Sequence, residues 1–194
     1  INSVSNPDEF DINLLVTPGV IHSLHPSVTN HAISKVEARA DSFFILDSIG
    51  YSDSIQTAIN TVKTLDSNYV GTYYPWVKIL DRDTNRQVWV PPSVVIAGVI
   101  SNTDAVAHEW FAPAGLNRGG LTSVTEARTR LTHAERDDLY ENRINPIASF
   151  PGQGVVVFGQ KTLQAKPSAL DRINVRRLLI RLRKFIASTS RFLV

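Results

Sequence analysis

Short apolar runs alternate with stretches of helical periodicity, and this alternation constrains the fold more than any other feature of the sequence. Residues 43–46 are Phe-Phe-Ile-Leu, an uninterrupted apolar run that is typical of a strand covered on both faces. Residues 53–65 place their apolar side chains on one helical stripe, with Asp53 as the expected N-cap and Gln56 three residues later. We therefore predict an α/β fold with a mixed, mainly parallel sheet and helices on its faces.

The same patterns predict the other elements of the fold. Strands are expected at residues 12–16, 69–74, 77–80, 87–90 and 155–158, and helices at 28–40, from 93 through 99 and from 132 through 140. Residues 81–85 have turn composition, which predicts a hairpin between two of these strands. Thr132 and Glu135 have the spacing of a capping box and indicate a helix start. Residues 110–123 are rich in Gly, Pro and Asn and predict a long loop.

Charge is distributed unevenly along the chain. Residues 166–194 contain eight Lys or Arg and one acid, Asp171, whereas the remaining residues contain 12 basic and 17 acidic side chains. A basic segment attached to an acidic body indicates an acidic partner, which could be nucleic acid, a membrane surface or an acidic protein. We interpret residues 1–165 as an α/β core and residues 166–194 as the start of a second unit that begins with a helix.

The sequence contains no complete catalytic or cofactor-binding motif. Residues 154–162 approach a phosphate-binding loop, but Gln160 stands where lysine is required, and the residues between the two glycines favour a strand. His22, His25 and His31 are close in sequence, but a proline interrupts any shared helix face. The chain has no cysteine, which excludes disulfides and thiolate metal sites. We expect no enzyme activity, no cofactor and no metal.

Asp47 directly follows the predicted strand at residues 43–46. Many α/β enzymes place a catalytic or metal-binding carboxylate at such a strand end. A metal site of the Asp-x-Ser-x-Ser type would need serines at positions 49 and 51, which are Ile49 and Tyr51 here. We therefore interpret Asp47 as a turn or cap residue.

The basic segment contains a predicted helix, Arg172–Ala187, with two different faces. At ~100° per residue, one broad apolar stripe is expected to pack on the subunit's own core: Val175, Leu178, Leu179, Leu182, Phe185 and Ile186. The opposite face has two isoleucines flanked by six cations, and we interpret it as an assembly interface: Arg172, Ile173, Arg176, Arg177, Ile180, Arg181, Arg183 and Lys184. The alternative is a solvated basic face on which the isoleucines are incidental or are covered by further chain.

Three blocks of motifs follow one another in the second half of the chain. The first extends from Pro91-Pro92-Ser93 to Ala112-Pro113-Ala114-Gly115, the second from Leu139-Tyr140 through Ile144-Asn145-Pro146-Ile147 to Lys161-Thr162, and the third from Asp171 to Leu178. Their order and spacing resemble those of the contractile tail sheath proteins of phages. Residues 11–19 also resemble the opening strand of long-tailed phage sheaths. Ile100-Ser101-Asn102 departs from the family pattern, in which an aromatic residue and an arginine are usual.

The resemblance implies a structural, non-enzymatic subunit that polymerises in helical rings around a tail tube and contracts to drive the tube through a host envelope. The implied partners are other copies of the chain, the tail tube protein, and baseplate and tail terminator proteins, with no membrane and no nucleic acid. The implied location is the virion, and the host cytoplasm during assembly. Family members are usually longer, so we expect a fragment without the N-terminal arm and the end of the C-terminal domain. The alternative function is a nucleic-acid-binding module that uses the basic C-terminal helix.

Overall fold

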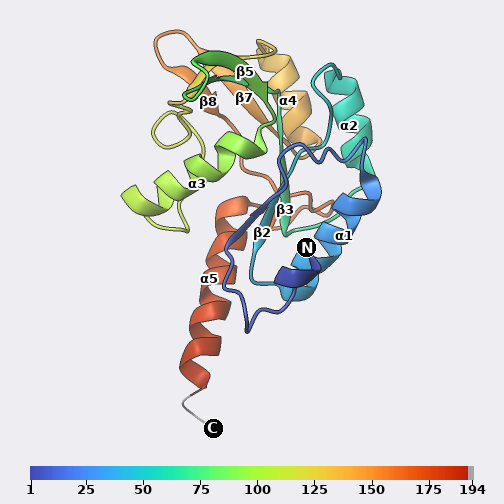
Figure 1. Ribbon diagram of the computed structural model, residues 1–194, viewed down its shortest axis with the longest axis vertical. Helices are drawn as coiled ribbons and strands as arrows, with labels where there is room; N and C mark the ends of the chain where they lie inside the picture. The colour runs from blue at the N-terminus through green and yellow to red at the C-terminus, as the bar shows by residue number, and fades with distance from the viewer. Residues whose placement is uncertain (192–194) are drawn as a thin grey trace.

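A sheet of five strands forms the centre of the molecule, which the computed structural model describes over residues 1–191 (Figure 1). In spatial order, its strands are β1 (Leu14–Val16), β2 (Phe43–Leu46), β3 (Val70–Tyr74), β7 (Ile144–Phe150) and β8 (Gly154–Val157). The first four are parallel to one another, and β8 is antiparallel to β7 at one edge. The prediction of an α/β fold with a mixed, mainly parallel sheet is confirmed.

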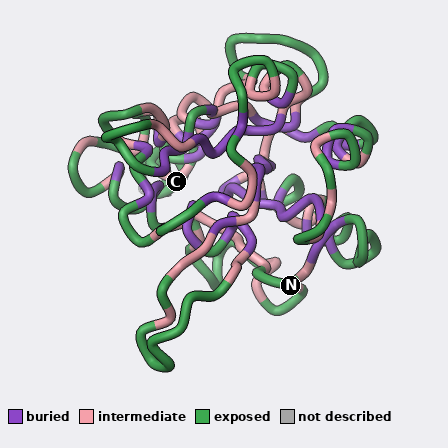
Figure 2. Tube along the Cα trace, turned by 90° about the horizontal axis from the view of Figure 1, so that it is seen from above, coloured by how far each residue is buried: buried purple, intermediate pink, exposed green. Residues whose placement is uncertain are grey.

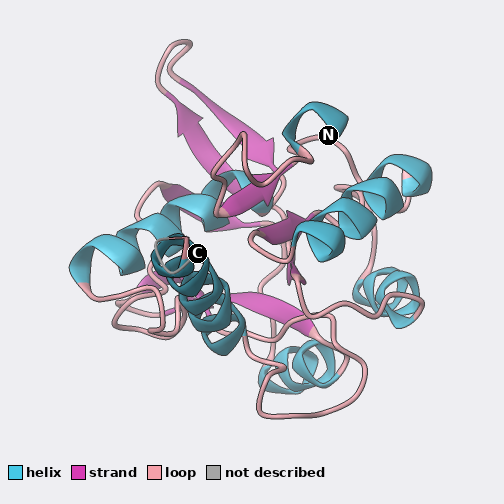
Figure 3. Ribbon diagram, turned by 90° about the horizontal axis from the view of Figure 1, so that it is seen from below, coloured by secondary structure: helices cyan, strands magenta, loops and turns pink. Residues whose placement is uncertain are grey.

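Helices cover both faces of this sheet (Figures 1 and 3). One face carries α1 (Pro26–Arg39), α2 (Ile55–Lys63) and α4 (His133–Glu141), and the other carries α3 (Ser93–Val106) and α5 (Ile173–Ser190). Phe44 and Leu46 belong to the first core cluster, whereas Phe43 and Ile45 belong to the second. Successive strand side chains point to opposite faces, so this apolar run serves two cores. Figure 2 shows the buried chain gathered through the middle of the molecule.

A smaller antiparallel sheet joins the end of the central one. Its spatial order is β5 (Arg86–Val90), β4 (Val77–Asp81) and β6 (Val124–Ala127). The predicted hairpin is confirmed as β4 and β5, and it projects from the body in Figure 3. The centroid of the Tyr51 ring lies 5.5 Å from that of Trp89 in β5 and 5.8 Å from that of Trp76, just before β4. These aromatic contacts hold the hairpin on the body. Strands β6 and β7 are not among the predicted elements.

The predicted helix starts are right for α4 and displaced by one residue for α2. In α4, Thr132 and Glu135 form the complete capping box. In α2 the N-cap is Ser54, whose hydroxyl accepts the Thr57 N–H, so the prediction that Asp53 caps this helix is wrong. The Asp53 carboxylate instead accepts the Gly50 N–H at 2.7 Å and closes the preceding turn.

Helix α5 follows an extended passage that returns to the central sheet. An isolated bridge pairs Lys161 with Arg172, and the Ile173 N–H donates to the Gln160 carbonyl, so the start of α5 is fixed beside β8. No helix within residues 1–191 combines the length and the apolar character that crossing a membrane would require. Residues 192–194, the end of the predicted second unit, lie outside the described residues, and the boundary after residue 165 stays a prediction.

Candidate assembly surface

The first half of α5 packs on the sheet through the face that the sequence suggested as an interface. Ile173 is 0% exposed and Ile180 is 6% exposed, and both belong to the core cluster that includes Phe43 of β2. Arg176 and Arg177 lie on the same side and are also buried. Four of the eight residues assigned to the interface are therefore interior residues of this chain, and their assignment to an exposed face is wrong.

The second half of α5 exposes the stripe that was expected to pack on the core. Leu182, Phe185 and Ile186 are 43%, 64% and 62% exposed, so this expectation is wrong for the distal turns. Val175, Leu178 and Leu179 are half-buried at the edge of the packed region. Arg181 and Arg183 are exposed beside the apolar side chains. We call residues 181–190 the distal half of α5. Figure 1 shows this half of the helix extending beyond the body.

The arginines of α5 can be buried because other elements supply partners for their charges. Arg177 donates to both carboxylate oxygens of Asp104 on α3, a two-pronged geometry that favours arginine. The Arg176 guanidinium lies 4.5 Å from the centroid of the Tyr69 ring, where the ring face attracts a cation. Arg172, which precedes the helix, donates to the Tyr140 hydroxyl. The hydrocarbon stems of these side chains cover apolar surface while the charged groups meet polar or aromatic atoms.

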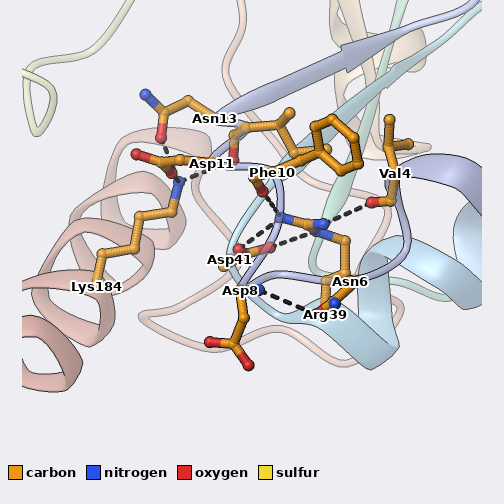
Figure 4. A network of polar contacts seen from close by, with 10 residues as sticks. Val4, Asn6, Asp8, Phe10, Asp11, Asn13, Arg39, Asp41 and Lys184 are labelled. Atoms are coloured by element: carbon orange, nitrogen blue, oxygen red, sulfur yellow. Dashed lines mark hydrogen bonds and ion pairs between the residues drawn. The ribbon is translucent and has the colours of Figure 1, made fainter. Parts of the chain in front are cut away.

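A second polar network joins the N-terminal segment, residues 4–13, to α1 and α5 (Figure 4). The Arg39 guanidinium pairs with Asp41 at 2.8 Å and also donates to the carbonyls of Val4 and Phe10. On the side of α5, the Lys184 ammonium donates to an oxygen of Asp11 at 2.6 Å. This hydrogen bond and the charge of Lys184 hold the pKa of Asp11 below its usual value. A cleft of about 450 Å³ between this segment and α5 is lined by both acidic and basic side chains.

Asp47 is a buried carboxylate at the end of β2 with a strongly shifted pKa, and its hydrogen-bond partner is a residue of the fold. It is 2% exposed and accepts the Ser93 N–H at 3.0 Å and the Ser93 hydroxyl at 2.6 Å. Burial raises the pKa of Asp47 to about 6, against the lowering effect of these two hydrogen bonds. Asp47 thus ties the end of β2 to the first turn of α3, a structural role. The N-cap residue of α3 is Pro92, so Asp47 accepts from this turn from 46 positions away and is not itself the cap.

The residues considered for metal or phosphate binding do not form a binding site. The histidines hydrogen-bond to other side chains, and the glycine-flanked run forms a strand. His22 Nδ1 lies 2.6 Å from the Thr29 hydroxyl, and His31 Nε2 lies 2.7 Å from the Asn2 side-chain oxygen. Over residues 1–191, no three His, Asp or Glu side chains come together as a metal would require. Residues 154–157 form strand β8 and not a phosphate-binding loop.

The sequence pattern does not reveal the N-terminal network. Arg39 belongs to the last turn of α1, and its carbonyl partners come from residues 29 and 35 positions earlier. Lys184 and Asp11 are 173 positions apart. The only local signal is the Arg39–Asp41 spacing, which does not by itself predict a pair that holds another segment.

Residues 2–163 match the model of the phage tail sheath protein central domain. The chain belongs to the phage tail sheath family. The resemblance inferred from the three motif blocks is therefore confirmed, and so is the expectation that the chain is related to structural proteins of contractile tails.

Two curated tail sheath proteins are similar to this sheath chain over most of its length. The tail sheath protein of Vibrio phage KVP40 is 41% identical over 132 residues, which are 68% of this chain and 19% of the relative. That of Enterobacteria phage T4 is 37% identical over 142 residues, 73% of this chain and 20% of the relative. The matched region thus spans about a fifth of the length of these relatives.

Solved structures of contractile systems share the fold. A chain of the anti-feeding prophage baseplate superposes with a TM-score of 0.77 at 27% identity, over 96% of this chain and 48% of that one. A chain of the anti-feeding prophage helical sheath in the contracted state gives a TM-score of 0.69 at 28% identity, over 96% and 49%. The sheath chain of an extracellular contractile injection system, at 24% identity and a TM-score of 0.77, shows the same fold.

Proposed function

We propose that this chain is the central part of a contractile tail sheath subunit, which stacks in helical rings around a tail tube and contracts to drive the tube through a host envelope. The observation that carries the proposal is the family match over residues 2–163. The likeness to a helical sheath chain in the contracted state supports it independently of the motif blocks. The role is structural and non-enzymatic, and it requires no cofactor.

The proposed partners are other copies of the subunit, the tail tube protein, and baseplate and tail terminator proteins. The subunit would reside in the virion after assembly in the host cytoplasm. The two core clusters pack the central sheet on both faces, and a body of this kind moves as a rigid unit between two arrangements of its interfaces. Of the eight residues assigned to an assembly interface, Arg181 and Arg183 remain exposed and are retained in the proposal.

Nucleic-acid binding through α5 has less support. A phosphate backbone is bound by a row of exposed cations. Here Arg176 and Arg177 are buried, and Lys184 is occupied by three oxygens of the N-terminal segment. Of the eight basic side chains that suggested this alternative, only half are therefore exposed enough to meet phosphate: Lys166, Arg181, Arg183 and Arg191.

Electron microscopy of the full-length protein that contains this chain tests the proposal. Purified full-length protein should form ordered tubes, alone or when tail tubes are added. Arg181→Glu combined with Arg183→Glu should lower the melting temperature only slightly, because both side chains are exposed and only the 3.7 Å approach of Arg181 to Glu109 is lost. The double variant should make assembly fail or become strongly salt-sensitive. Full-length protein that stays monodisperse with and without tubes would contradict the sheath role. Normal assembly of the double variant would contradict only the part assigned to these two arginines.

A further inference from the structure

Residues 4–13 cross the surface between α1 and α5 with almost no apolar anchoring. No residue in this segment is buried, and none belongs to a strand or an α-helix. The segment is held on the side of α1 by Arg39, whose side chain is only 3% exposed. Because Asp41 balances its charge, this buried arginine can present fixed donors to the carbonyls of Val4 and Phe10.

On the side of α5, one lysine holds the end of the same segment. The Lys184 ammonium donates to Asp11 at 2.6 Å, to the Ile12 carbonyl at 2.8 Å and to the Asn13 side-chain oxygen at 2.6 Å (Figure 4). A lysine has three N–H donors, so this set of contacts uses all of them. Arg191 adds an ion pair to Asp8 at 3.0 Å, but both side chains are largely exposed and the pair contributes little.

The distal half of α5 has few links to the body of the subunit. Ile180 is the last buried residue of the helix, and from 181 to 191 only Lys184 is even half-buried. Ten residues of helix beyond Ile180 extend about 15 Å, and none of them belongs to either core cluster. Arg181 approaches Glu109 at 3.7 Å, a longer contact between partly exposed side chains. The contacts of Lys184 are therefore the main link between these turns and the body.

We propose that residues 4–13 form a strap that sets the direction of the distal half of α5, with Arg39 as its fixed anchor and Lys184 as its release point. Breaking the Lys184 contacts frees the side chains of Asp11 and Asn13 and the distal turns of the helix together. Arg39 still keeps residues 4–10 on the body, and the Asn13 carbonyl still accepts the Phe43 N–H of β2. The N-terminal segment and the C-terminal helix are thus coupled within one subunit. This coupling is a property of the folded chain and goes beyond the proposed function, because it does not require assembly.

Distances between spin labels test the strap in the 194-residue chain. The chain contains no cysteine, so labels can be placed at Ser188→Cys on α5 and Asn60→Cys on α2 without side reactions. The parent should give one narrow distance distribution. Lys184→Met removes the ammonium and keeps the aliphatic stem, and it should widen the distribution by about twofold or more as the distal turns lose their support. The matched control is Arg183→Met, which removes a neighbouring exposed cation and should leave the width unchanged.

The coupling between the strap and the distal half of α5 is also tested with substitutions in the strap alone. Asp11→Asn combined with Asn13→Ala weakens two of the three oxygen contacts and should widen the same α2–α5 distribution, although neither residue belongs to α5. Melting temperatures of all variants, expected within about 2 °C of the parent because the changed residues are not buried, verify that they fold. An unchanged width in Lys184→Met would overturn the proposal, and so would an effect of Lys184→Met without any effect of the strap variant.

Discussion

Asp47 makes the stability of this fold depend on pH in the direction opposite to an ordinary surface carboxylate. Its carboxylate is buried between the end of β2 and the first turn of α3, with Ser93 as its partner. Burial raises its pKa from 3.8 to about 6, so the folded state binds the proton more tightly than the unfolded chain does. The stabilisation that comes from this proton is complete below the unfolded pKa and is lost as the pH rises through about 6.

The size of the effect follows from the two pKa values of Asp47. With 3.8 for the unfolded chain and about 6 for the fold, ionisation of this group costs the folded state about 3 kcal/mol at pH 8. At pH 5 this cost is about 2 kcal/mol, because the folded group is then mostly protonated. Asp47 alone therefore lowers the free energy of unfolding by about 1 kcal/mol between pH 5 and pH 8.

Asp47→Asn removes the titration and keeps the geometry. The asparagine oxygen can accept the Ser93 N–H, and its NH₂ group can donate to the Ser93 hydroxyl oxygen. We expect urea unfolding at pH 5 and pH 8 to show the variant gaining about 1 kcal/mol of stability relative to the parent as the pH rises. Asp83→Asn, at the exposed hairpin turn, controls for the loss of one carboxylate. If the parent and Asp47→Asn have parallel stability profiles, the argument from burial fails.

Two further predictions compare matched pairs of substitutions by urea unfolding. A Cβ at Gly119 would lie 2.6 Å from a backbone carbonyl oxygen of β8, whereas one at Gly120 meets nothing within 4 Å. Gly119→Ala should therefore cost about 2 kcal/mol or more, and Gly120→Ala should change stability by less than about 1 kcal/mol; similar losses would refute the close approach. Ile173→Ala should cost about 3 kcal/mol and Phe185→Ala less than about 0.5 kcal/mol, because only the isoleucine is buried. A larger loss for Phe185→Ala than for Ile173→Ala would mean that α5 packs through the apolar stripe expected from its sequence.

The alternation of apolar runs and helical stripes was sufficient to predict the fold class, but it did not reveal β7. This strand contains Asn145 and Pro146, which are both uncommon in a buried strand. The structure accommodates Asn145 because its side chain hydrogen-bonds to the Thr72 carbonyl and to the backbone of Lys161. Pro146 lies where the pairing of β7 changes from β3 to β8, so the missing N–H leaves the ladder intact. Both compensations come from distant residues and leave no mark in the local sequence.

Helix α5 shows why its periodicity predicted the two faces and not which one turns inward. The repeat identifies the residues that share a side, but burial also depends on partners from elsewhere, and Arg177 meets Asp104 from 73 positions away. The basic segment was expected to need an acidic partner outside the chain. Much of that partner is the acidic body itself, because Arg177 pairs with Asp104 and Lys184 pairs with Asp11. The charge asymmetry along the sequence therefore fastens the C-terminal helix to its own subunit.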